Sequence, residues 1–218
     1  MACQVSNIVD EVLLIKDLVS IDFQNRIIEK MSGENSFPWY TIDRIGHKDF
    51  FEKDETNIYT DINVSDFGGL YHMVVDDGVP RSDDAYFFTS ILDSYCTALN
   101  KRISKIHRIR IRYTHPVPNH TFAKYAAPHI DFNSEEDFTT LVYYVDNSDG
   151  DTILFSKKHV IGEEYDPVIK EPLSEVYRHT PTKGEALVFS GHRYHAGNYP
   201  IDYGRRVVIN FDFVEHEA

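Results

Sequence analysis

The chain has 218 residues, which suits one large domain, and 42% of them are hydrophobic, which is enough for a sizeable core. Its formal net charge of -13 at pH 7 and its lack of a basic stretch argue against general nucleic-acid binding, because few phosphates could be neutralised. Two cysteines imply no disulfide framework, and no apolar run approaches the roughly 20 residues that a membrane span needs.

The N-terminal half is predicted to contain helices, loops and one short strand. Residues 1–17 carry acidic side chains and no basic region, so they form a poor secretory signal and we expect a cytoplasmic protein. Apolar residues within 12–19 favour a strand. Apolar side chains at helical spacing predict helices over 20–33 and 82–100. Residues 44–81 have no steady period; we expect a long loop with short strands, either a substrate lid or a surface connection.

After residue 105 the hydrophobic period changes from helical spacing to alternation. Turn residues at 146–150 would join two of the predicted strands as a hairpin. Helices followed by a run of short strands favour an antiparallel sandwich or barrel with helices on one face. We expect one domain over 1–218, with helical and loop support in 1–104 and a β core in 105–213. The predicted strands cover residues 108–113, 122–132, 139–145, 152–155, 176–179, 186–189 and 206–213.

Two ligand-type residues, His129 and Asp131, are separated by one residue in an expected strand. Alternate side chains of a strand point to the same face, so both can reach one point in space. A second imidazole would complete a two-histidine, one-carboxylate triad, a ligand set that suits Fe(II). His195 competes with His192 and His179 for this role, and we favour His195 because Gly197, two residues on, permits close backbone approach. Zinc could use the same three groups.

Residues 105–213 resemble the catalytic core of the Fe(II)/2-oxoglutarate-dependent dioxygenases, in particular their prolyl 4-hydroxylase-like branch. Two departures are Asp149, where the family hairpin begins with glycine, and Val145-Asp146 in place of Leu-Asn. The motifs that carry the resemblance occur in the family's order: His129-x-Asp131, Leu141-Val142-Tyr143-Tyr144, Gly150-Asp151-Thr152-Ile153-Leu154-Phe155, Pro181-x-x-Gly184-x-Ala186-Leu187-Val188-Phe189, His195-x-Gly197 and Gly204-x-Arg206.

The resemblance implies a mainly β, α+β fold, with a double-stranded β-helix (jelly-roll) core and N-terminal helices packed on one sheet. It also implies that His129, Asp131 and His195 bind Fe(II), that 2-oxoglutarate and O2 are cosubstrates, and it admits ascorbate. The reaction implied is hydroxylation with release of succinate and CO2. A prolyl residue in a peptide or protein is the expected substrate, and other protein side chains or small molecules stay open.

The end strand alternates polar and apolar residues, which places Arg206 on a face suited to a polar cavity. There it could pair with the distal carboxylate of 2-oxoglutarate, with Arg205 as the alternative. The resemblance further implies that Tyr144 donates to that carboxylate and that Tyr113 lines the pocket. Thr140 lies four residues before Tyr144 and so shares its face, from which it could donate to the same group.

A different class of function stays open, namely a cupin-like metal-binding or sensory domain without turnover. Conversion of 2-oxoglutarate to succinate would favour the enzyme. A degenerate binding module is a further alternative, and it would have lost its ligands. Here His129, Asp131, His195 and Arg206 are all present. The sequence leaves the oligomeric state open, and no membrane or nucleic-acid partner is expected.

Overall fold

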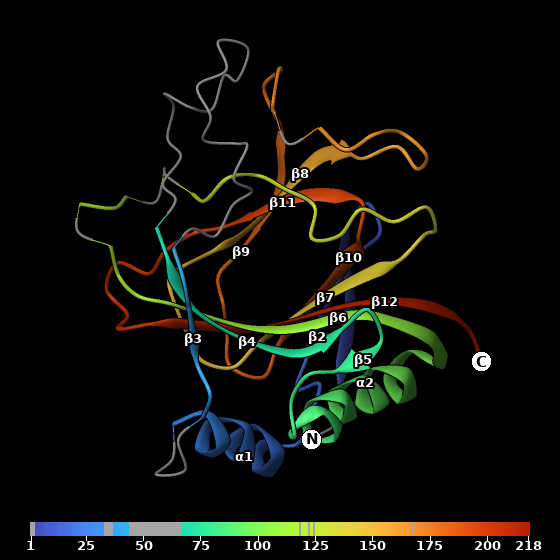
Figure 1. Cartoon of the computed structure of the whole chain (residues 1–218), viewed down its shortest axis with the longest axis vertical. Coiled ribbons are helices and arrows are strands. Elements are labelled where there is room, and N and C mark those ends of the chain that lie inside the picture. The colour runs from blue at the N-terminus through green and yellow to red at the C-terminus, as the bar shows by residue number, and fades with distance from the viewer. Residues whose placement is uncertain are drawn as a thin grey trace.

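The computed structural model describes residues 3–32, 37–43, 67–117, 119–121, 123, 125–166 and 168–218. Within these ranges the chain folds into two helices, α1 (Ile21–Ser32) and α2 (Ala85–Leu99), and twelve strands whose pairings are antiparallel (Figure 1). The strands are β1 (Gln4–Val9), β2 (Val12–Lys16), β3 (Tyr40–Ile42), β4 (Gly69–Asp76), β5 (Val79–Pro80), β6 (Lys101–Thr114), β7 (Thr139–Tyr144), β8 (Thr152–Lys158), β9 (Glu175–His179), β10 (Ala186–Ser190), β11 (Arg193–Gly197) and β12 (Arg206–Glu217).

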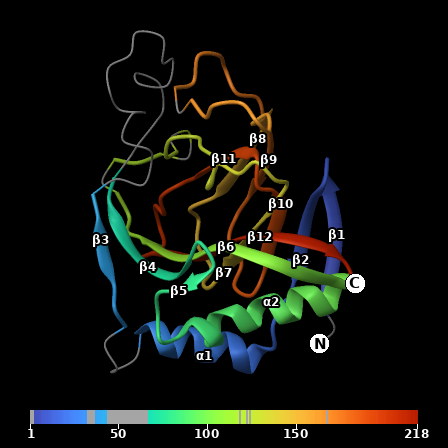
Figure 2. The ribbon, with the colours of Figure 1, turned by 45° about the vertical axis from the view of Figure 1, so that its right-hand side comes forward.

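The strands form two sheets that lie one above the other. The major sheet has the order β1-β2-β10-β7-β12-β6-β4-β3, with β5 paired to β4, and the minor sheet has the order β11-β8-β9. Both helices lie against one face of the major sheet, and the minor sheet lies on its other side (Figures 1 and 2). No helix in the described ranges is both long and apolar enough to cross a membrane.

Alternation along β6 and β12 separates the two sides of the major sheet. Ile109 and Ile111 of β6, with Ile209 and Phe211 of β12, are fully buried in the cluster that packs under the helices. Arg110 and Asn210, which lie between these residues, face the minor sheet, and so does Arg206 at the start of β12. The predicted polar face of the end strand is therefore confirmed, and it is this face that carries the site.

The two predicted helices are confirmed, whereas two predictions about strands are wrong. Within 122–132 the described residues form no regular strand, and His129 makes an isolated bridge to His195. Pro128 in this segment has no N–H to donate to a ladder. The predicted hairpin also fails, because β7 belongs to the major sheet and β8 to the minor sheet.

The connection between β7 and β8 crosses from one sheet to the other. The carboxylate of Asp149 accepts the backbone N–H groups of Ile201 (3.1 Å) and Asp202 (2.7 Å), which ties this turn to a distant loop. The N-terminal part of the chain also supplies β1 to β5, so it contributes strands to the major sheet as well as helices. Residues 44–66 of the predicted loop 44–81 lie outside the described residues, so the structure does not test whether this loop is a substrate lid.

Candidate active site

Three potential metal ligands meet between the two sheets. The ligand atoms of His129, Asp131 and His195 all lie within 4.8 Å of one another. His129 lies in the loop before β7 and His195 in β11, and their backbones exchange two hydrogen bonds of 2.9 Å each. This bridge fixes the separation of the two imidazoles, so the structure brings together the three residues that the sequence singled out.

The two imidazoles are held so that their Nε2 atoms face the carboxylate. His129 Nδ1 donates to the Ala127 carbonyl (2.7 Å) and His195 Nδ1 to the Arg193 carbonyl (3.2 Å), since a carbonyl can only accept. The Nε2 atoms then lie 3.9 Å and 3.2 Å from Asp131 oxygens. In metal sites, the ring nitrogen that does not bind the metal donates a hydrogen bond that orients the histidine. Both imidazoles make such a hydrogen bond here.

The protonation of the histidines also suits a cation. Burial, reinforced by the neighbouring His195, lowers the pKa of His129 to about 3, so this ring is neutral and able to ligate. Burial alone would lower the pKa of His195 as well, but the hydrogen bond to Asp131, the charge of Asp131, the Arg193 carbonyl and Asp212 together outweigh burial and raise it. The space beside Asp131 therefore favours positive charge. A cation bound there would displace the proton of His195, and two imidazoles with one carboxylate fit Fe(II) by donor type.

The carboxylate of Asp131 is fully buried and is held from three directions. Arg110 Nη2 donates to Oδ1 (3.0 Å) and Asn210 Nδ2 to Oδ2 (3.3 Å), and Arg108 Nη2 forms an ion pair with Oδ1 at 2.8 Å. Burial would raise the pKa of Asp131, but the charge of Arg108 and the hydrogen bond with His195 hold it well below its usual range. The group is thus a charged ligand with a fixed orientation.

Arg206 lies buried at the other end of the same site. Its Nε donates to the Gly150 carbonyl (2.7 Å) and its Nη2 to the Thr152 hydroxyl (2.8 Å). Thr152 also accepts a hydrogen bond from the Tyr144 hydroxyl (2.9 Å), so its own hydrogen can be donated to a ligand. Arg205, the alternative anchor, pairs with Asp146 at 2.6 Å and is absent from this cavity's lining.

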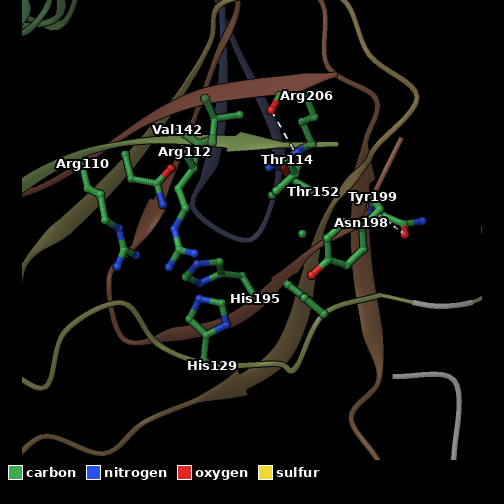
Figure 3. Close-up of a pocket in the computed structure, with 15 residues that line it drawn as sticks. Arg110, Arg112, Thr114, His129, Val142, Thr152, His195, Asn198, Tyr199 and Arg206 are labelled. Atoms are coloured by element: carbon green, nitrogen blue, oxygen red, sulfur yellow. Dashed lines mark hydrogen bonds between the residues drawn. The ribbon is translucent and has the colours of Figure 1, made fainter. Parts of the chain in front are cut away.

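A cavity of about 50 Å³ connects the histidines to Arg206 (Figure 3). His129 and His195 line it together with Arg206, Thr152 and Asn198. The competing histidine His192 lies elsewhere, with its Nε2 3.2 Å from the Glu136 carbonyl. The two histidines of the candidate metal centre and a buried guanidinium therefore share one cavity.

The remaining predicted residues have different surroundings. Tyr144 is fully buried and reaches the site through Thr152. Thr140 does share the face of Tyr144, but its hydroxyl donates to Asp212 (2.8 Å). Tyr113 points to the opposite side of β6 and packs edge-on against Trp39, with ring centroids 5.6 Å apart. Neither Thr140 nor Tyr113 lines the cavity.

Sequence reasoning missed several polar residues of the site. Arg108, Arg110 and Arg112 occupy alternate positions of β6, and the last two line the cavity. Their alternation with Ile109 and Ile111 was visible as a strand signal, but a solvated strand face would give the same pattern. Thr152 lies in the motif formed by residues 150–155, but the sequence predicted no role for it.

The fold has relatives among solved structures. No protein-family model matches the chain, and no curated protein matches it in sequence. An oxidoreductase of the 2OG-Fe(II) oxygenase family from Burkholderia pseudomallei is 13% identical, with a TM-score of 0.52 over 95% of this chain and 87% of that one. The epimerase SnoN, in complex with Fe3+, alpha ketoglutarate and nogalamycin RO, is 9% identical, with a TM-score of 0.54 over 94% and 79%.

A prolyl hydroxylase from Trichoplax adhaerens, in complex with a peptide fragment of the hypoxia inducible factor oxygen degradation domain, is also similar. It is 13% identical, with a TM-score of 0.51 over 93% of this chain and 83% of that one. At these identities the likeness concerns the fold. The chain thus has the fold of the 2OG-Fe(II) oxygenase family, the family that its sequence motifs resemble.

Proposed function

We propose that the protein is an Fe(II)- and 2-oxoglutarate-dependent dioxygenase that hydroxylates its substrate and releases succinate and CO2. The observation that carries this proposal is the shared cavity, in which His129 and His195, grouped with Asp131 as potential metal ligands, face a buried Arg206. A zinc hydrolase would have no use for that guanidinium. The proposal includes the double-stranded β-helix of the family as the arrangement of the two sheets.

The chain's own residues have distinct tasks in this proposal. His129, Asp131 and His195 hold the metal, and Arg108, Arg110 and Asn210 keep the carboxylate charged and oriented. Arg206 keeps its Nη1 hydrogens for the distal carboxylate of 2-oxoglutarate, and Thr152 can donate to the same group. Bound Fe(II) supplies the redox chemistry, since no side chain can activate O2.

The first test separates turnover from mere metal binding. We expect Mn(II) to bind, as seen by electron paramagnetic resonance, and 2-oxoglutarate to bind to the Mn(II)-loaded protein by calorimetry. With Fe(II), O2 and ascorbate, slow formation of succinate without a substrate is expected by mass spectrometry. The control is His195→Ala, which should form none. Metal binding without 2-oxoglutarate binding or succinate would favour the cupin-like metal-binding domain instead.

The substrate needs a separate screen. Peptidyl proline is the class to test first, because a structural neighbour is a prolyl hydroxylase in complex with a peptide. Peptides and small metabolites would be incubated with the loaded protein, and products detected as a mass increase of one oxygen atom. Succinate yield that rises in step with product would identify a coupled substrate.

A further inference from the structure

The side chain of Asn210 has one polar atom that the fold leaves without a partner. Asn210 lies on β12, directly opposite Arg110 of β6 and Val142 of β7, and is only 9% exposed. Its amide nitrogen donates to Asp131 Oδ2 at 3.3 Å, whereas no donor among the described residues reaches its buried amide oxygen. A buried acceptor without a donor is uncommon in folded proteins, so this oxygen is suited to a donor on a bound molecule.

The orientation of this amide is fixed by its neighbour. The charged carboxylate of Asp131 can only accept a hydrogen bond, so the nitrogen of Asn210 must be the atom that faces it. Exchanging the nitrogen and the oxygen of the amide would set two acceptors against each other. The oxygen therefore cannot be satisfied by turning the amide over, and it stays available to a donor that enters the site.

Asn210 lies at the metal end of the cavity. It lines the cavity together with His129 and His195, and the Asp131 oxygen that it contacts is 3.2 Å from His195 Nε2. Arg206, the proposed cosubstrate anchor, is four residues earlier on the same strand, which is roughly 13 Å at the rise of a β-strand. A group that meets the oxygen of Asn210 is therefore beside the metal and far from the distal carboxylate of 2-oxoglutarate.

The charges at this end of the cavity select the kind of donor. Arg110 and Arg112 line the same cavity, and their guanidinium groups extend toward the imidazoles of His129 and His195 (Figure 3). Like charges repel, so an ammonium group would be disfavoured beside these guanidinium groups and beside a bound metal ion. A neutral N–H or O–H, from an amide or a hydroxyl group, meets no such repulsion.

We propose that Asn210 is a specificity-determining residue, whose amide oxygen accepts a hydrogen bond from a neutral N–H or O–H group of the substrate beside the metal. This inference rests on the proposed function and narrows its substrates to molecules with an amide or a hydroxyl group at that position. A prolyl residue has no N–H of its own, so in a prolyl peptide the donor would be the amide of a neighbouring residue. A site built to accept such a donor discriminates against an analogue without one, because its acceptor is then left buried and unpaired.

The test uses acetamide, ethanol and acetone as probes of the protein loaded with Mn(II) and 2-oxoglutarate. Acetamide and ethanol carry an N–H or an O–H donor, whereas acetone has the size of acetamide and no donor. Bound Mn(II) accelerates the nuclear relaxation of a nearby ligand, so the methyl protons of each probe report binding close to the metal. We expect acetamide or ethanol to bind saturably, about fivefold or more tightly than acetone. The stronger of the two tells an amide substrate from a hydroxyl substrate.

Two substitutions test Asn210 itself, and a third is the matched control. Asn210→Leu is similar in size and removes the oxygen, so the donor probes should lose their advantage over acetone. Asn210→Thr keeps a hydroxyl oxygen that can accept, and it should retain part of that advantage. Asn7→Leu makes the same change at an exposed position of β1 and should retain all of it. The affinity for 2-oxoglutarate, measured by calorimetry, should stay within about twofold in each variant, because Arg206 is intact.

The outcomes distinguish this inference from the function on which it rests. If the wild-type protein binds Mn(II) and 2-oxoglutarate but binds acetone as tightly as the donor probes, or binds none of the three, the inference is overturned and the proposed function stands; this arm needs no variant to fold. If Asn210→Leu keeps the full advantage of the donor probes, another group accepts the donor, and if it weakens 2-oxoglutarate instead, Asn210 serves the cosubstrate; either result overturns the inference. If the wild-type protein binds no Mn(II), both fail together.

Discussion

Replacing Gly150 by alanine tests how closely Arg206 is packed. A Cβ at this position would lie 2.8 Å from Arg206 Cδ, 2.8 Å from the Asn198 carbonyl oxygen and 3.0 Å from the Pro200 nitrogen. Two of these are backbone atoms, and Arg206 is buried with its Nε bound to the Gly150 carbonyl. None of the three can move away freely, so the added methyl group must displace the guanidinium or the loop.

The expected size of the effect follows from that overlap. Overpacking a closed site typically costs 1–3 kcal/mol, and about 2 kcal/mol would lower the Tm of a domain of this size by roughly 4–8 °C. Displacement of Arg206 should in addition weaken 2-oxoglutarate binding. Gly204→Ala makes the same chemical change where nothing lies within 4 Å of the new Cβ, so it should leave both quantities near wild type.

Calorimetry can measure both quantities on the same samples. Thermal unfolding gives the Tm, and titration of the Mn(II)-loaded protein gives the affinity for 2-oxoglutarate. The reasoning would be refuted if Gly150→Ala matched Gly204→Ala in both measurements, because the contacts around Arg206 would then be looser than the structure has them. A lower Tm with unchanged affinity would show that the loop, and not the guanidinium of Arg206, moves to make room for the methyl group.

Substitutions at other residues test the metal ligands, the cosubstrate anchor and the pH dependence of stability. Alanine at His129, Asp131 or His195 should each abolish Mn(II) binding seen by electron paramagnetic resonance, and retained binding with full turnover would remove that residue from the triad. Arg206→Ala should raise the Kd for 2-oxoglutarate about tenfold or more with Mn(II) affinity near normal, since a charge-assisted pair is lost; an unchanged Kd would place the anchor elsewhere. Burial, with the charges of Arg206 and Lys16, lowers the pKa of His179 to about 4, although a carboxylate oxygen of Glu185 lies 3.2 Å from Nε2 and opposes this shift; the unfolded chain therefore binds the proton first. Stability should fall by up to about 3 kcal/mol as the pH drops from about 6.5 to about 4. His179→Gln should reduce the dependence of stability, measured as Tm, on pH. An equally steep profile would show that His179 does not cause this dependence.

Local patterns predicted the helices and the polar face of the end strand. The helices follow from apolar residues at helical spacing, and the position of Arg206 follows from strict alternation along β12. Both signals lie within one element and need no knowledge of its neighbours. The proximity of His129, Asp131 and His195 was predictable for a related reason, because few chemical roles require two histidines and a carboxylate in such a setting.

Features that depend on neighbouring elements were not predictable in this way. The turn before Thr152 has ordinary hairpin chemistry, yet β8 pairs in the minor sheet because Asp149 and Gly150 are committed to the loop after β11 and to Arg206. Thr140 has the predicted face, but its partner is Asp212 on β12. The arginines on β6 could be recognised as residues of the site only once the minor sheet was seen to cover that face.

The origin of the ligands has a consequence for the durability of the protein. His195 belongs to β11 of the minor sheet, whereas the groups that hold Asp131 belong to β6 and β12 of the major sheet. A cation bound by residues of both sheets would hold the two sheets together. At a concentration one hundred times its Kd, it would raise the free energy of unfolding by about 2.7 kcal/mol. If the proposed Fe(II) binds there, molecules without the metal would be degraded first by proteases, and the supply of metal would set the lifetime of the protein.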